Sequence, residues 1–128
     1  MQIVTAYGTM WPRNAKNIRR IPGRRSGFGR GVYILFDGSM PVYAGKGNIR
    51  QRIYAARRSK RKGQFWDRFS WYAVRDPKMM HDIEVLILRM FPRYLRPLTR
   101  QDGHFLKARR HRAPDAKNVE YITRKPKA

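Results

Sequence analysis

The sequence predicts an α+β domain in which short strands and two helices share one hydrophobic core. Three observations lead to this fold class. Two β-branched and aromatic segments, 31–36 and 42–44, flank a turn signal, and a third aromatic segment covers 65–74. Apolar residues recur with helical spacing over about 49–61 and 78–90. The length of 128 residues suits a single domain with one core.

The N-terminal part is predicted to be a mostly irregular basic arm over residues 1–27, with at most one short strand or helix. Its apolar start is interrupted at Trp11-Pro12, and basic residues then alternate with glycines and Pro22. Residues 28–103 are expected to form the core of the domain. Residues 104–128 are expected to form a basic C-terminal extension.

The segments 31–36 and 42–44 are predicted to form a β-hairpin around Asp37-Gly38-Ser39. If these three residues are the loop, Tyr33 faces Tyr43 directly across the two strands. A two-residue loop would place the two tyrosines on opposite faces of the sheet. A cross-strand tyrosine pair is usually ordinary packing, so it indicates a functional site only together with its neighbours.

A helix is predicted to begin after Asn48, because Asn48 and Gln51 have the spacing of a capping box. Ile49 and Ile53 mark its buried side, and the helix is expected to continue to about Arg61. Its other positions are rich in arginine and lysine, which we expect to be mostly exposed.

The segment 65–74 is predicted to be a third strand, with apolar side chains covered on both faces. Asp76 and Pro77 supply an N-cap and a first-turn proline for a helix over about 78–90. Apolar residues nearly encircle this helix, so it is predicted to be the central buried helix of the domain. Trp66 and Trp71 are expected in the core, whereas Trp11 is a candidate for stacking on bases.

The charge of the chain predicts an anionic partner. Thirty Lys and Arg residues oppose eight Asp and Glu, for a net charge of +22. Nucleic acid, DNA or RNA, is the leading partner because phosphate neutralisation releases counterions, and an anionic membrane is the weaker candidate. Phosphate contacts are predicted for Arg24, Arg25, Arg30, Lys46, Arg50, Arg57, Arg58, Lys60, Arg61 and Arg100.

Several classes of protein are excluded by composition. The chain has no cysteine, which excludes a disulfide framework, a disulfide-linked partner and thiolate-bound zinc. No stretch approaches the about 18 to 20 consecutive apolar residues of a membrane span, and the N-terminus lacks the apolar core of a signal peptide. We therefore expect an intracellular protein, cytoplasmic or nucleoid-associated. Its oligomeric state is left open.

The histidines and the acidic residues differ in what they indicate. His81, His104 and His111 share no metal-site spacing and are expected to be surface or nucleic-acid contacts. Glu84 lies in the apolar segment DIEVLIL, where a carboxylate is desolvated and needs a cation. Two interpretations remain for Glu84: a salt bridge to an arginine, or a metal ligand or acid at a phosphodiester site.

Four sequence features, in this order and spacing, resemble the GIY-YIG endonuclease family. They are GVY at 31–33, YAG at 43–45, Arg52 and Glu84. The resemblance covers about residues 20–105. Within it, IPGRRSGFGRGVYIL resembles the usual approach to the first motif, and YAGKGNIRQRI resembles the second motif of the excision-repair incision subunit.

The resemblance implies a small three-stranded antiparallel sheet flanked by helices and a metal-dependent cut of one phosphodiester bond. Tyr33 would act as, or position, the general base, and Tyr43 would assist through its hydroxyl. Arg52 would stabilise charge on the phosphate, and Glu84 would hold Mg²⁺ or Mn²⁺. A tyrosine has a pKa near 10, so Arg52 and the metal are expected to lower the pKa of Tyr33.

The sequence departs from the family pattern at two places. Ala56 stands where many members have a histidine, and Thr99 or Arg100 stands where many have an asparagine. Two hypotheses follow. The chain is a metal-dependent endonuclease acting on DNA or structured RNA, or it is a catalytically silent structural nucleic-acid-binding protein of the same fold, for example a ribonucleoprotein component.

Overall fold

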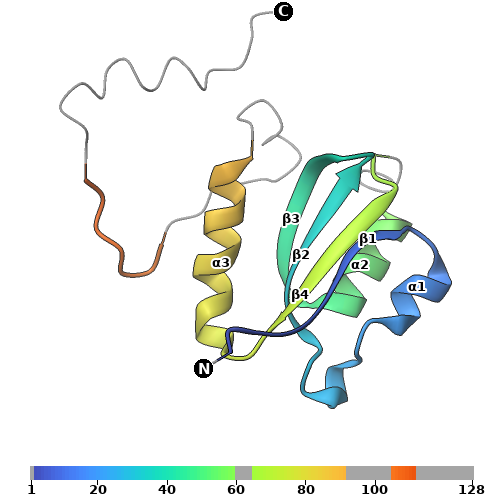
Figure 1. Ribbon diagram of the computed structural model, residues 1–128, viewed down its shortest axis with the longest axis horizontal. Helices are drawn as coiled ribbons and strands as arrows, with labels where there is room; N and C mark the ends of the chain where they lie inside the picture. Colours follow the sequence, from blue (N-terminus) through green and yellow to red (C-terminus); the bar gives the residue numbers. More distant parts are fainter. Residues whose placement is uncertain (1, 60–64, 92–104, 112–128) are drawn as a thin grey trace, which may run out of the picture.

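The computed structural model describes residues 2–59, 65–91 and 105–111 and confirms the α+β fold class (Figure 1). No helix among these residues has the length and apolar character needed to cross a membrane. The strands form one antiparallel sheet in the order β1-β4-β2-β3. The elements are β1 (Val4–Pro12), α1 (Ala15–Arg20), the 3₁₀ helix η1 (Arg24–Ser26), β2 (Arg30–Asp37), β3 (Met40–Asn48), α2 (Ile49–Arg58), β4 (Arg68–Val74) and α3 (Pro77–Met90).

The sheet has four strands in the described residues, so the prediction of three strands is wrong. The additional strand, β1, belongs to the segment that was expected to be an irregular arm, and it pairs with β4. Its register shifts between Gly8 and Trp11, where Met10 has a φ of 56° and its backbone N–H donates to Ser70 Oγ at 2.9 Å. This irregularity interrupts the alternation of side chains by which a strand is recognised in a sequence.

The first strand is part of the core. The Trp11 ring makes edge-to-face contacts with Phe69, at 6.0 Å between ring centroids, and with Trp71, at 5.5 Å. Such contacts add to the stabilisation from burial of aromatic surface. Trp66 and Trp71 are each 3% exposed, which confirms their expected place in the core.

The hairpin turn has two residues, not three, because Asp37 pairs with Met40. That turn alone would put the two tyrosines on opposite faces, but a bulge at Val42 adds one residue to β3 and restores them to the same face. Tyr33 pairs with Gly45 rather than with Tyr43, so the predicted direct pairing is wrong. The tyrosine rings are diagonal neighbours, with centroids 6.1 Å apart.

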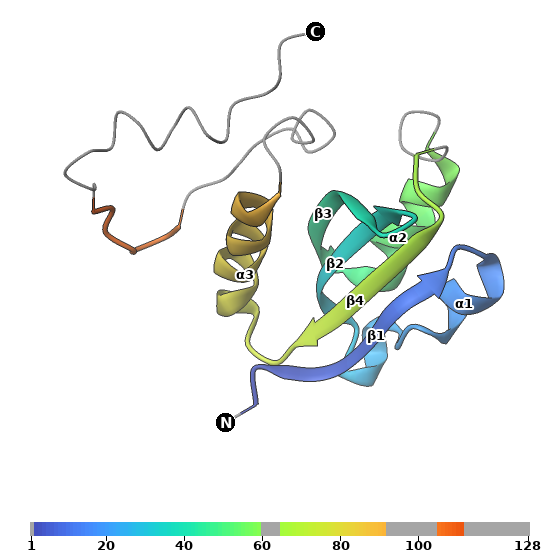
Figure 2. The ribbon, with the colours of Figure 1, turned by 45° about the horizontal axis from the view of Figure 1, so that its top comes forward.

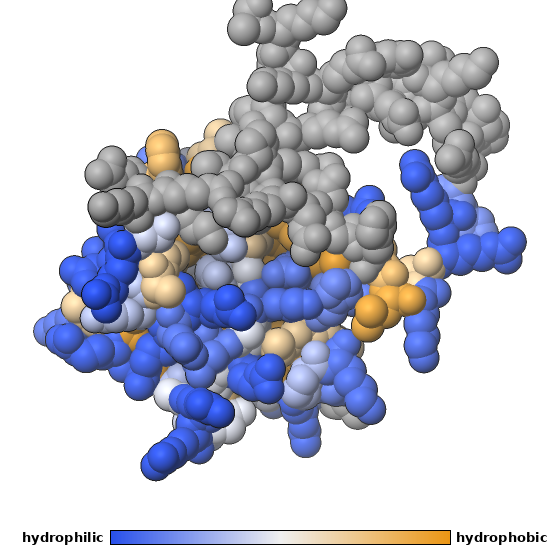
Figure 3. Space-filling model, turned by 180° about the vertical axis from the view of Figure 1, so that it is seen from behind, coloured by the Kyte–Doolittle hydropathy of each residue, from blue (hydrophilic) through white to orange (hydrophobic). Residues whose placement is uncertain are grey.

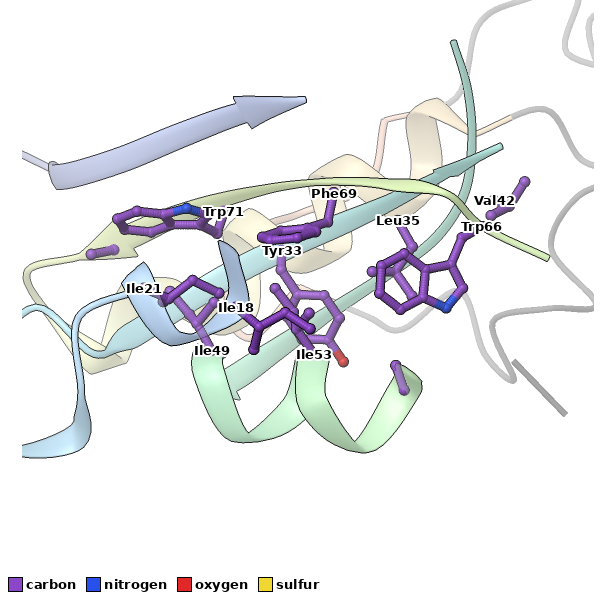
Figure 4. Packing of buried hydrophobic residues seen from close by; sticks show 12 residues of the cluster. Ile18, Ile21, Tyr33, Leu35, Val42, Ile49, Ile53, Trp66, Phe69 and Trp71 are labelled. Atoms are coloured by element: carbon purple, nitrogen blue, oxygen red, sulfur yellow. The ribbon is translucent and has the colours of Figure 1, made fainter. Parts of the chain in front are cut away.

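Helices cover both faces of the sheet. Helices α1 and α2 lie on one side and α3 on the other, as Figures 1 and 2 show from two directions. Figure 4 shows Tyr33 pointing from the sheet toward α2, among Ile49 and Ile53. The larger buried cluster lies on this side and consists of Ile18, Ile21, Tyr33, Leu35, Val42, Ile49, Ile53, Ala56, Trp66, Phe69, Trp71 and Ala73.

Helix α2 and strand β4 follow the sequence prediction in part. The helix begins after Asn48, but the Asn48 side chain makes no capping hydrogen bond, so the predicted capping box is absent. The helix ends at Arg58 rather than near Arg61. Strand β4 is buried on both faces, as expected for a central strand.

Helix α3 begins where predicted but is less buried than expected. The Asp76 side chain accepts a hydrogen bond from the Lys78 backbone N–H at 2.9 Å, and Pro77 occupies the first turn. Only one stripe packs on the sheet, and Leu86 is 49% and Met90 70% exposed. The expectation of a central buried helix is wrong because α3 covers one face of the sheet as an outer layer.

The role of β1 is tested by Trp11→Ala. We expect this change to lower the free energy of unfolding by about 3 kcal/mol, because a large aromatic contact in the core is lost. Thr9→Ala, on the exposed side of the same strand, should change it by about 0.5 kcal/mol or less. Urea denaturation followed by circular dichroism measures both. Equal small effects would mean that this segment behaves as an arm.

Candidate active site at the β3 edge

The residues singled out in the sequence surround one end of β3, the last strand in the order of the described sheet. Tyr33 and Tyr43 project toward the side of the sheet that α2 covers, and Arg52 lies on α2 itself. Lys46 projects to the other side, where α3 carries Glu84. Both sides therefore meet around the glycine-rich end of one strand.

Two glycines of β3 make room for the site. A Cβ added at Gly45 would lie 2.5 Å from the Tyr33 hydroxyl oxygen, so only a glycine permits this ring to lie across β3. Gly47 has a φ of +123°, and a Cβ there would approach Arg52 Nε to 3.3 Å. The YAG motif and the following Gly47 thus let Tyr33 and Arg52 reach the edge of the sheet.

The surroundings of Tyr33 favour its neutral hydroxyl. Burial raises its pKa well above the usual value, and the charge of Tyr43 and the hydrogen bond to its hydroxyl raise it further. Arg52 acts in the opposite direction but is outweighed. Arg52 thus acts in the expected direction, and a net lowering of the Tyr33 pKa by Arg52 together with a metal stays a prediction.

Glu84 is a half-buried carboxylate beside a lysine. Its side chain is 17% exposed, and Lys46 Nζ lies 4.0 Å from Oε1. Burial raises the pKa of Glu84, while Lys46, His81 and Arg52 lower it by smaller amounts. The nearest cationic partner is thus a lysine from β3 rather than the arginine that one interpretation of the sequence anticipated.

His81 belongs to this cluster, which sequence reasoning missed. Its Nδ1 lies 2.7 Å from Lys46 Nζ. An ammonium group has only donors, so with charged Lys46 the His81 Nδ1 accepts and the ring carries its proton on Nε2. His81 and Glu84 are three residues apart on a helix, which places them on one face, and this spacing was the available signal.

The arginines predicted to contact phosphate separate into distinct groups. Arg24 and Arg30 meet Arg52 at a cavity of about 470 Å³, whereas Arg50 donates to the backbone carbonyl of Ile21 at 2.8 Å. Arg58 stacks on Tyr54. The cavity is lined by Arg24, Arg30, Gly47, Asn48, Gln51, Arg52 and Ala55. Lys60, Arg61, Arg100 and His104 lie outside the described residues.

Glu84 is a suitable ligand for a hard divalent cation. Mg²⁺ is commonly held by one or two carboxylates together with waters and substrate phosphates. Within residues 2–59, 65–91 and 105–111, no three His, Asp or Glu side chains are grouped as a metal site. A metal at Glu84 would therefore be held by this carboxylate, water and the substrate, which fits the chemistry of Mg²⁺ or Mn²⁺.

Ala56, at the position where many GIY-YIG endonucleases have a histidine, is part of the packed core. Ala56 is 5% exposed and belongs to the buried cluster beneath α2, while Thr99 and Arg100 lie outside the described residues.

Comparisons with protein-family models, curated proteins and solved structures found no match to this chain. Its function therefore has to be argued from the residues and their geometry.

The buried carboxylate predicts how stability depends on pH. Because folding raises the pKa of Glu84, ionisation of this group opposes folding. Glu84→Gln should match the wild type in melting temperature below about pH 4, the ordinary range of a glutamate. As the pH rises through the raised pKa, the variant should become the more stable protein.

Thermal unfolding of both proteins in EDTA, from about pH 3 to 8 at constant ionic strength, measures this difference. The low-pH end is the internal control, since a protonated glutamate and a glutamine are nearly isosteric. A wild type that gains stability over the variant as the pH rises would show that Glu84 forms a net favourable ion pair.

Proposed function

We propose that the chain is a metal-dependent endonuclease that hydrolyses phosphodiester bonds of DNA, or of structured RNA, by a GIY-YIG type mechanism. One observation supports this most. Tyr33, Tyr43, Arg52 and Glu84, which lie between residues 33 and 84 of the sequence, surround one end of β3, and the charge of Arg52 acts on both Tyr33 and Glu84. The pKa values of Tyr33 and Glu84 are both raised, and groups with perturbed pKa values cluster at functional sites.

Arg52 is assigned to the phosphate. Its side chain is exposed, and it makes no ion pair within the described part of the chain. A guanidinium forms two parallel hydrogen bonds with a phosphate, and these strengthen as negative charge develops in the transition state. Lys46, held by His81, supplies a second positive charge on the α3 side of the strand.

Glu84 is assigned to the metal. A divalent cation bound there would polarise a phosphoryl oxygen and stabilise the charge on it. The half-buried carboxylate is oriented by its position on α3 and by Lys46 at 4.0 Å. Its raised pKa reflects the cost of burying an anion that Lys46, His81 and Arg52 only partly offset, a cost that a bound cation would reduce.

The two tyrosines are assigned to the attacking water. With a neutral Tyr33 hydroxyl hydrogen-bonded to Tyr43, the pair is suited to position water rather than to take its proton in the metal-free state. Tyr43 is the more exposed of the two and is the one placed to meet solvent. Tyr33 would become a base only if positive charge added at the site lowered its pKa.

Cleavage assays with nicked plasmid and labelled oligonucleotides in Mg²⁺ or Mn²⁺ test this proposal. Glu84→Gln and Arg52→Ala should each lower the rate by about 10² to 10³, because each removes charge stabilisation at the phosphate. Arg58→Ala is the matched control, since this exposed arginine lies on the same helix but does not line the cavity. Equal background cleavage in all four proteins would rule out the enzyme.

The second candidate function is a structural nucleic-acid-binding protein without catalysis. It is favoured by the net charge of +22 and by the raised pKa of Tyr33, because a hydroxyl that stays protonated cannot take a proton from water. Hydrophilic side chains are spread over the face seen in Figure 3, as an extensive contact with the phosphate backbone of a nucleic acid requires. Under this alternative, wild type and Glu84→Gln bind nucleic acid equally, and neither cuts it.

A salt titration alone does not distinguish the two candidate functions, whereas product formation at unchanged affinity does. In both cases the affinity for nucleic acid should fall steeply with salt concentration, because binding releases counterions. Metal-dependent product formation that disappears in Glu84→Gln, at unchanged affinity, supports the enzyme. Co-purification of the protein in a stable ribonucleoprotein, with no cleavage by any variant, supports the alternative.

A further inference from the structure

We propose that Arg24, Arg30 and Arg52 form a phosphate-binding subsite for a nucleic-acid strand. The phosphate group that it holds is a neighbour of the scissile phosphate, not the scissile phosphate itself. The identity of the ligand as part of a substrate strand rests on the proposed function. The subsite itself rests on the cavity, its charge and its construction, which are independent of catalysis.

The cavity has the size and lining of a small-ligand site. Its volume of about 470 Å³ falls within the range of about 300 to 1,000 Å³ that is usual for such sites, and exceeds what a bare phosphate fills. Asn48 and Gln51 add side-chain amides to the guanidinium groups. These groups suit a phosphate with its attached sugar.

The three arginines bring unneutralised charge together. None of their side chains makes a hydrogen bond or an ion pair with another residue in the part of the chain that the structure describes. Guanidinium groups that converge on one cavity repel each other, and their donors have no acceptor among the described residues. An anion with several oxygen acceptors relieves both conditions, and phosphate matches the fork geometry of arginine.

The loop that carries Arg24 and leads into Arg30, the first residue of β2, is held against the first turn of α2. Arg50 Nε donates to the Ile21 carbonyl at 2.8 Å, before the loop. The Ile49 backbone N–H donates to the Gly29 carbonyl at 3.0 Å, after it. Both ends of the loop are thus fixed to the helix that presents Arg52.

The same loop is also closed internally. Ser26 Oγ donates to the Gly23 carbonyl at 2.8 Å and accepts from the Phe28 backbone N–H at 3.0 Å. The Ser26 backbone N–H donates to the same Gly23 carbonyl. The backbone carrying the two arginines is therefore ordered without a ligand, which lowers the entropic cost of binding.

Arg52 connects this subsite to the candidate active site. It lines the cavity, and its charge acts on Tyr33 and Glu84. Because the cavity lining includes Arg52 but not Tyr33, Tyr43 or Glu84, a phosphate in the cavity lies beside the position of the scissile phosphate, and the five donors of Arg52 can serve both phosphates. The subsite selects strands that carry at least two neighbouring phosphates, and it orients the strand across the end of β3.

Binding of small anions tests the subsite without any cleavage. Thymidine 3′,5′-bisphosphate and inorganic phosphate are titrated calorimetrically, at low salt, into the wild type, Arg24→Gln, Arg30→Gln and Arg25→Gln. We expect about tenfold weaker binding of the bisphosphate to the first two variants, the loss of about one charge-assisted hydrogen bond. Arg25 was predicted from the sequence to contact phosphate, but it is exposed beside Arg24 and does not line the cavity, so its variant is the matched control for this subsite.

The control decides between a site and a general field of charge. Binding that Arg25→Gln preserves within about twofold supports the subsite, provided all variants keep the melting temperature of the wild type. Equal weakening in all three variants, or none in any, overturns it. If Glu84 variants and wild type alike fail to cut nucleic acid while this pattern holds, the proposed function fails and the subsite stands.

Oligonucleotides bound by Glu84→Gln distinguish the source of the phosphate. An internal phosphodiester is indicated if one methylphosphonate beside the cut position weakens binding, and if adding Arg24→Gln abolishes that sensitivity. A terminal phosphate is indicated if the affinity depends instead on a 5′-phosphate, again through Arg24. Either result supports the subsite. An affinity that depends neither on the methylphosphonate nor on the 5′-phosphate overturns it.

Discussion

The contact between the Tyr33 ring and the backbone of Gly45 is the constraint on which the rest of the site depends. Because Gly45 has no side chain, a tyrosine from β2 extends across β3 and packs beneath α2 beside Ile49 and Ile53. This burial stabilises the domain and brings a hydroxyl to the edge of the sheet. It also raises the pKa of Tyr33, so position and reactivity have one cause.

The electrostatics of the site follow from that burial. Two groups that lose stability when ionised, Tyr33 and Glu84, share the end of β3 with Lys46 and Arg52. The cations only partly offset the desolvation of the anionic forms. A divalent metal would balance the negative charge of Glu84, which the nearby cations offset only in part, and a phosphate would balance the positive charge of Arg52. We infer that the buried groups of the site lower the folding stability of the domain and, in return, leave charges that can bind a metal and a phosphate.

Local signals predicted some elements and missed others. The start of α3 was predictable because Asp76 and Pro77 act through bonds within one turn, and β4 because its aromatic residues mark a covered strand. Strand β1 was missed because its bulge breaks the alternation. The burial of α3 was overestimated because hydrophobic periodicity does not reveal how many layers surround a helix. His81 was missed because its partner, Lys46, lies 35 residues away.

The sequence by itself determined the fold class, the hairpin, the overall positive charge and the four residues proposed for chemistry. Only the tertiary structure decided how they meet. Tyr33 and Tyr43 lie on the same face of the sheet only because a bulge at Val42 compensates for the two-residue turn. The convergence of the three arginines depends on hydrogen bonds from α2 to the loop before β2. Bulges and long-range backbone hydrogen bonds leave no periodic trace in a sequence, because they join residues whose spacing is set by folding alone.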